Sequence, residues 1–121
     1  MKKTNEISSA ELCVMQVLWE EKSPMCVQDV MGRLPQNKWE YRTVATLLMR
    51  LCEKGAANVE KQNKVNFYTP VLDKESYTAL QTKSFVEKLY NGSAKELAVS
   101  LFKSNELSKE DIEEIKKMFD L

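Results

Sequence analysis

One amphipathic pattern constrains this chain of 121 residues more than any other feature. From residue 42 onward, apolar side chains recur at spacings of three and four, which predicts a helix over residues 42–55 with one face buried against a core. The apolar stripe consists of Val44, Leu47, Leu48, Leu51 and Cys52. Gly55 then provides the left-handed cap that commonly ends a helix. The other side of this helix is left for solvent or for a partner.

That other side is short, cationic and rich in hydroxyl groups. Arg42, Thr46 and Met49 point away from the apolar stripe, and Thr43 and Arg50 lie on one flank. An arginine can form paired hydrogen bonds with a guanine edge or a phosphate, and a threonine offers a hydroxyl to phosphate and a methyl group to thymine. The residue types therefore suit a helix that lies in the major groove of DNA.

A compact hairpin is predicted directly after this helix. Residues 59–61 and 65–68 have the composition of two strands, and residues 62–64 form the turn between them. Lys61 and Lys64 lie close to the tip, where they can reach the DNA backbone beside the helix. A helix suited to DNA followed by a basic-tipped hairpin is the layout of a winged helix-turn-helix.

Two further helices are predicted before this unit. Ser8 and Glu11 have the spacing of a capping box, which places the start of a helix that runs from about Ser9 to Glu21. A short helix follows over residues 26–33, and residues 35–38 form the turn before the third helix. Three helices and a hairpin complete the winged helix-turn-helix, and we assign residues 1–71 to this DNA-binding domain.

The rest of the chain is predicted to be helical. One helix spans residues 74–90, and Ser93 and Ser108 each have the position of a cap for a further helix. These three helices hold fewer than 50 residues and are too thin to bury a core alone. We therefore expect residues 72–121 to form a helical dimerisation domain that shares apolar faces with a second copy. The residues expected in this homodimer interface are Phe85, Leu89, Leu97, Leu101, Phe102, Ile115 and Phe119. The predicted fold class is mainly α with a small β-hairpin wing.

Composition excludes several other classes of protein. The chain has no histidine, which removes His-based catalysis and His-ligated metal sites, and no glycine-rich phosphate loop is present. Its three cysteines have no C-x-x-C spacing and are expected as reduced thiols. No apolar run approaches the roughly 20 residues of a membrane span, and residues 1–6 lack the apolar core of a signal peptide. We expect a cytoplasmic protein that is not an enzyme, has no cofactor or metal, and is not inserted in the membrane.

Charge favours nucleic acid only locally. The 18 basic and 18 acidic residues balance overall, yet residues 38–64 hold six basic residues against three acidic ones. The residues predicted to contact double-stranded DNA are Arg42, Thr43, Thr46, Arg50, Lys54, Lys61 and Lys64. Arg42 and Thr46 are expected near the bases, and Arg50 and Lys64 at phosphates. The alternative is a winged helix that binds only proteins, since a polar helix surface is also typical of ordinary solvated faces.

The order of several motifs resembles the BlaI/MecI/CopY family of bacterial penicillinase repressors over essentially the whole chain. The opening segment of residues 7–11 is followed by Val14-Met15 and Trp19. The predicted DNA-binding helix reads Trp39-x-x-Arg42-Thr-Val-x-Thr46-Leu-Leu-x-Arg50-Leu-x-x-Lys54-Gly55. Tyr68-x-Pro70, Asn91-Gly92-Ser93 and Leu107-Ser108 come after it in the family's order.

The resemblance implies dimers that bind palindromic operators and block transcription of β-lactamase or related cell-wall-antibiotic response genes. It also implies a membrane sensor metallopeptidase pathway that leads to a cut in the C-terminal domain. The family's cleavage dipeptide, commonly Asn-Phe, aligns with Ser100-Leu101 here. Because this dipeptide differs, release by a ligand instead of cleavage stays open as an alternative.

Other departures from the family concern packing and metal sensing. Leu12 stands where the family usually has Trp, and Ala45 occupies a position that often carries a long side chain. Residues 56 and 57, both alanine, are smaller than usual. The copper-responsive branch carries paired C-x-C motifs near its C-terminus, whereas this chain has no cysteine after Cys52, so thiolate metal sensing is not expected.

Overall fold

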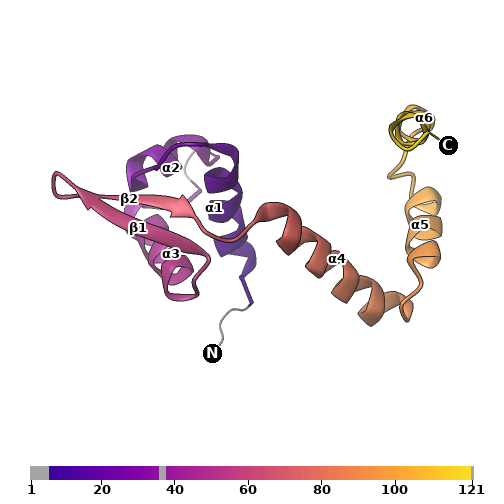
Figure 1. Cartoon of the computed structure of the whole chain (residues 1–121), viewed down its shortest axis with the longest axis horizontal. Helices are drawn as coiled ribbons and strands as arrows, with labels where there is room; N and C mark the ends of the chain where they lie inside the picture. The colour runs from indigo at the N-terminus through magenta and orange to yellow at the C-terminus, as the bar shows by residue number, and fades with distance from the viewer. Residues whose placement is uncertain (1–5, 36–37, 121) are drawn as a thin grey trace. The chain divides into compact units, whose positions relative to one another are not determined.

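The computed structural model describes residues 6–35 and 38–120, and the chain divides into two compact units, Met1–Ser76 and Tyr77–Leu121. Figure 1 labels the six helices and two strands of the described residues. The fold is mainly helical with one β-hairpin, which confirms the predicted fold class. The expected turn at residues 35–38 and the segment 1–6 fall partly outside the described residues.

Three helices form the first part of the N-terminal unit. They are α1 (Ser9–Glu20), α2 (Val27–Arg33) and α3 (Tyr41–Glu53). The predicted capping box is present: the Ser8 hydroxyl accepts a hydrogen bond from the amide of Glu11, and the Glu11 carboxylate accepts one from the amide of Ser8. Gly55 follows α3 with a φ of +81°, a conformation that glycine adopts without steric cost.

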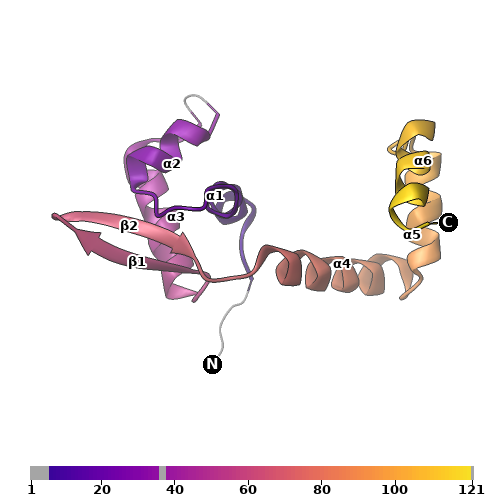
Figure 2. The same cartoon turned by 45° about the horizontal axis from the view of Figure 1, so that its top comes forward.

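The hairpin consists of β1 (Ala57–Gln62) and β2 (Val65–Pro70), paired antiparallel with Ala57 opposite Pro70 and Gln62 opposite Val65. Two residues, Asn63 and Lys64, make the turn, with φ values of 51° and 69°. Positive φ at both positions is the backbone of the tight turns whose twist matches that of the strands. Figures 1 and 2 show this turn projecting beyond the helices of the unit.

The base of the hairpin is fixed to the segment between α1 and α2. The backbone groups of Met25 and Tyr68 exchange two hydrogen bonds of 3.0 and 2.8 Å, so Met25 adds a single bridge to the edge of β2. Both side chains are buried. This bridge, which was not predicted from the sequence, anchors one end of the wing to the helices.

The core of the N-terminal unit lies where α1, α2, α3 and the base of the hairpin meet. Its largest fully buried side chains are Met15, Leu18, Leu48, Leu51, Val14, Val30 and Val44. Four of the five residues in the predicted α3 stripe are buried, and the fifth, Cys52, is half-buried. The inner face of α3 is thus packed against the core, and only its outer face is available to a partner.

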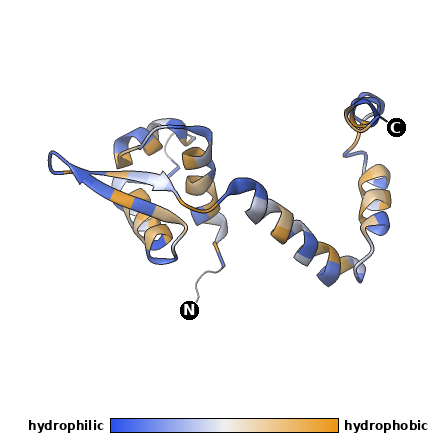
Figure 3. Ribbon diagram, in the orientation of Figure 1, coloured by the Kyte–Doolittle hydropathy of each residue, from blue (hydrophilic) through white to orange (hydrophobic). Residues whose placement is uncertain are grey.

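The C-terminal unit contains most of α4 (Lys74–Tyr90), followed by α5 (Ala94–Lys103) and α6 (Lys109–Met118). Asn91 and Gly92, with φ values of 50° and 83°, end α4, and the hydroxyl groups of Ser93 and Ser108 cap the next two helices. Figure 3 shows apolar residues along all three helices. Among the described residues of this unit, only Val86 is buried. The unit therefore leaves most of its apolar surface uncovered.

Within residues 6–35 and 38–120, none of the helices has both the length and the apolar character required to cross a bilayer.

Candidate nucleic-acid interface

The outer face of α3 carries four of the predicted DNA-binding residues. Arg42, Thr43, Thr46 and Arg50 are all exposed, on the side of the helix that faces away from the core. The local cause is the helical period: with Val44, Leu47, Leu48 and Leu51 directed inward, the polar residues between them must point outward. The result is a rigid helix whose free surface has two guanidinium groups and two hydroxyl groups within three turns.

The wing contributes two more cations. Lys61 lies near the end of β1 and Lys64 in the turn, and both are exposed. Lys64 also lines a groove between α3 and β2, whose α3 wall is formed by Tyr41, Ala45 and Met49. The structure thus places Lys64 beside the outer part of α3, whereas the α3 residues Arg42, Thr43, Thr46 and Arg50 do not line this groove.

The floor of this groove includes Tyr68, which is buried. Burial raises the pKa of Tyr68, and the opposing hydrogen bond with Asn66 does not cancel this effect. The phenol therefore stays neutral at physiological pH. Burial and the nearby Glu53 carboxylate likewise raise the pKa of Cys52, which keeps its thiol protonated and suits a packing role.

Lys54, the remaining predicted DNA-binding residue, is engaged within the protein. Its ammonium group donates hydrogen bonds to Glu11 Oε1 at 2.6 Å and to the carbonyl oxygen of Glu6 at 2.7 Å. Glu11 is only 2% exposed. Burial raises the pKa of Glu11, but the hydrogen bonds from Lys54 and Ser8 and the charge of Lys54 outweigh this effect and hold the pKa below its usual value. Lys54 thus neutralises a buried carboxylate, and we leave it out of the proposed DNA contacts.

Glu11 was predicted from the sequence only as a capping residue, and its burial was not predicted. One signal was available: Glu11 lies three, four and seven residues before Val14, Met15 and Leu18, so it belongs to the buried stripe of α1. A carboxylate in such a stripe needs a cationic partner. The identity of that partner, 43 residues away, is not visible in local spacing.

The residues predicted for a dimer interface are largely exposed in the single chain. Phe85, Leu89, Phe102, Ile115 and Phe119 are exposed large apolar side chains. Leu97 and Leu101 on α5 are half-buried and line a groove together with Phe85 and Leu89 of α4. Three further exposed apolar residues of this unit, Leu80, Val99 and Met118, lie outside the predicted set of interface residues.

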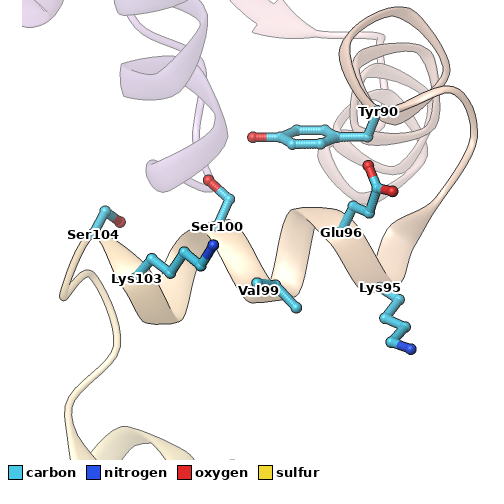
Figure 4. Close-up of a pocket in the computed structure, with 7 residues that line it drawn as sticks. All are labelled: Tyr90, Lys95, Glu96, Val99, Ser100, Lys103 and Ser104. Carbon is cyan, nitrogen blue, oxygen red and sulfur yellow. The ribbon is translucent and has the colours of Figure 1, made fainter.

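Ser100 and Leu101, the dipeptide aligned with the family's cleavage site, lie inside α5 and are half-buried. Ser100 lines a shallow groove beside Tyr90. Figure 4 shows Ser100 and Glu96 pointing to the side of α5 on which the Tyr90 ring lies. The bond between Ser100 and Leu101 is thus helical, and a protease would need it extended.

No group of three or more potential metal-ligating side chains is found among the residues that the structure describes.

Comparison with known proteins gives one consistent result. The family model of the penicillinase repressor matches residues 7–120. The penicillinase repressor of Bacillus licheniformis is 35% identical over 115 residues, which cover 95% of this chain and 90% of the relative. The methicillin resistance regulatory protein MecI of Staphylococcus aureus is 32% identical over 114 residues, covering 94% of this chain and 93% of the relative.

A solved structure resembles the N-terminal part of the chain. It is the solution structure of the Bacillus licheniformis BlaI monomeric form in complex with the blaP half-operator. The two share 41% sequence identity with a TM-score of 0.51, over 64% of this chain and 94% of that chain. The match over nearly the full length and the shared fold show that the chain belongs to the penicillinase repressor (BlaI/MecI) family of winged-helix DNA-binding repressors, which regulate transcription and are not enzymes.

Proposed function

We propose that this chain represses transcription as a homodimer, with α3 of each copy in the major groove of operator DNA and the wing against the adjacent backbone. The observation that carries this proposal is the division of α3 into two faces. Its inner face is buried, and its outer face presents Arg42, Thr43, Thr46 and Arg50 beside a wing that carries Lys61 and Lys64. The relative solved with the blaP half-operator supports the same use of the fold.

The contacts divide into two kinds. Arg42 and Thr46 lie on the centre of the outer face and are assigned to base edges, which carry sequence information. Thr43 and Arg50 on the flank, and Lys61 and Lys64 on the wing, are assigned to phosphates, which fix the position of the protein on the duplex. Together these groups give a salt-dependent affinity to which each phosphate contact contributes.

The homodimer is proposed from the apolar surface of the C-terminal unit. Its exposed side chains include Phe85, Leu89, Phe102, Ile115 and Phe119, and removing a side chain of this size from water stabilises by about 1.5–3 kcal/mol. A second copy offers the same surface and forms a two-fold interface with it. A two-fold protein matches a palindromic operator, because each copy then reads one half-site.

The regulated genes are proposed from the relatives. A penicillinase repressor and a methicillin resistance regulatory protein are named among them, so we place this chain in the control of β-lactamase or related cell-wall-antibiotic response genes. Operator binding and the control of these genes take place in the cytoplasm. The signal is proposed to come through a membrane sensor metallopeptidase pathway.

Release is proposed to follow a cut between Ser100 and Leu101. A helical bond must first open locally, and local opening is less costly in a unit with one buried residue among those described than in a full core. The cut separates α6 from the DNA-binding unit and reduces the shared apolar surface. Mass spectrometry of the protein from antibiotic-treated cells tests this step: a fragment ending at Ser100 is expected, whereas intact protein released from DNA argues for a ligand.

The proposal of operator binding is tested by selection from random duplexes with the full-length chain. An inverted repeat should be enriched, with half-site centres separated by about one helical turn or a multiple of it. The selected duplex should bind at least about a thousandfold more tightly than a scrambled duplex of the same composition. Equal affinity for both duplexes would contradict a repressor function and favour a protein-binding winged helix.

A further inference from the structure

Apolar side chains form a strip along α3 beside the wing. Tyr41 and Met49 are 52% and 58% exposed, and Ala45 between them is half-buried. Their spacing of four residues makes them neighbours along one side of the helix. We call these three residues the α3 apolar strip. The inner face of α3 already packs against the core, so the exposed side chains of Tyr41 and Met49 are not needed for core packing.

The surroundings of the strip identify the partner that it fits. The strip forms one wall of the groove whose other wall includes Lys64, Val65 and Asn66 of the wing. None of the side chains that line this groove, all within the described residues, is acidic. Arg42 and Thr46 lie next to the strip on the same exposed surface. An apolar strip bordered by cations and hydroxyl groups suits a polyanion that also presents apolar groups.

We propose that the α3 apolar strip reads thymine methyl groups in the major groove and so sets a preference for thymine at positions under α3. This inference rests on the proposed binding of DNA through α3. Duplex DNA matches both properties of the surface, because its backbone is anionic and the C5-methyl of thymine is the apolar group that its bases present in the major groove.

The strip would distinguish thymine from cytosine, which contacts between charged residues and phosphates cannot do. Phosphate contacts are the same for every sequence, whereas a methyl group is present on thymine and absent from cytosine. Removing one buried methyl group corresponds to about a fourfold loss in binding constant. The Met49 side chain is unbranched and flexible, so it can adjust to a methyl group at its position.

Uracil provides a direct test, because it differs from thymine only by the missing methyl group. The duplex selected by the full-length chain is prepared with each thymine replaced in turn by deoxyuridine, and binding is measured by fluorescence anisotropy. For the wild-type protein, replacement at one or more positions of each half-site should weaken binding about fourfold. Replacement in the flanking sequence should have no effect.

Two substitutions assign the effect to the strip. In Met49→Ala or Tyr41→Ala, the ratio of affinities for thymine and uracil duplexes should fall to about one at the position that each residue contacts. Met49→Leu retains an apolar side chain and should keep the fourfold ratio. Arg50→Ala is the matched control on the same helix: it should weaken binding to both duplexes equally and leave the ratio unchanged.

The outcomes separate this inference from the proposed function. If deoxyuridine has no effect at any position, the strip does not read thymine, although operator binding is unaffected. The same conclusion follows if the ratio of affinities for thymine and uracil duplexes is unchanged in both Met49→Ala and Tyr41→Ala. Failure to select any preferred duplex overturns both proposals. Circular dichroism of each variant should match that of the wild type, since Tyr41 and Met49 are exposed.

Discussion

The Lys54 ammonium group, directly after α3, donates a 2.6 Å hydrogen bond to the Glu11 carboxylate in the first turn of α1. The same ammonium group holds the carbonyl oxygen of Glu6 at 2.7 Å. One cation thus fixes the end of α3 to the start of α1. Because the outer face of α3 is the proposed DNA-binding surface, this pair helps to set the position of that surface on the core.

Lys54→Met should destabilise the protein through the carboxylate that it leaves behind. Glu11 is buried and would lose its charged partner, at a cost of about 1–3 kcal/mol. The matched control is Arg33→Met, which breaks the ion pair between Arg33 and Glu21, where both side chains are about a third to a half exposed. That pair should contribute less than about 1 kcal/mol. Urea unfolding measures both, and equal costs would contradict the structural role of Lys54.

Stability should fall in acid, partly through Glu11. A carboxyl group whose pKa is lower in the folded protein stabilises it above the unfolded pKa, and this contribution is lost as the pH falls through the folded pKa. The loss should therefore begin below about pH 5, since the unfolded value for glutamate is about 4.3. Hydrogen bonds to Asp73 and Asp111 lower the pKa of each of these residues too, so both act in the same direction.

Glu11→Gln isolates the contribution of Glu11 to this pH dependence. The free energy of unfolding of the variant should change less between pH 6 and pH 3 than that of the wild type, because one linked proton is removed. Identical pH profiles would show that the Glu11 carboxylate titrates alike in the folded and unfolded states.

Lys64→Gly should separate stability from DNA binding. Lys64 has a φ of 69°, a conformation that is strained for a residue with a Cβ and free for glycine, so the change should stabilise by about 1 kcal/mol. Loss of the charge should weaken DNA binding and lower the salt slope by about one. Lys61→Gly is the control on the same hairpin: it lies in β1, where glycine is unfavourable, and should lose both stability and affinity.

Leu89→Glu should prevent dimerisation. Leu89 is 60% exposed in the single chain, so the fold of one copy tolerates the change, while a carboxylate in the proposed apolar interface has no partner. Sedimentation at micromolar concentration should show a dimer for the wild type and a monomer for the variant. Lys83→Glu, an exposed site on the opposite side of α4 from Phe85, is expected to remain dimeric. A monomeric wild type would remove the basis of the dimer proposal.

The structural features that depend on residues close together in the sequence could be predicted from it. The α3 stripe follows from a period of 3.6, and its burial at Val44, Leu47, Leu48 and Leu51 was predicted correctly. The serine caps depend on contacts with amides three residues away, and the break at residues 91–92 depends on the local backbone of Asn91 and Gly92; both agree with the structure.

Contacts between distant segments could not be predicted in this way. The bridge between Met25 and Tyr68 and the pair of Glu11 and Lys54 join residues that local patterns do not connect. The groove beside Tyr41 also depends on where the wing folds back against α3. This limit affected the predicted DNA-binding residues. Lys54 was predicted to contact DNA, whereas in the folded protein its ammonium group is paired with the buried Glu11 carboxylate.

Footprinting on the selected duplex tests the central claim, that the outer face of α3 binds DNA, most directly. The wild type, Arg42→Ala, Arg50→Ala and, as a control in α6, Lys116→Ala are compared over a range of salt concentrations. We predict that Arg50→Ala weakens protection and lowers the salt slope by about one, that Arg42→Ala also relaxes sequence preference, and that Lys116→Ala does neither. Protection that is unchanged in both Arg42→Ala and Arg50→Ala would place the DNA-binding surface elsewhere on the protein.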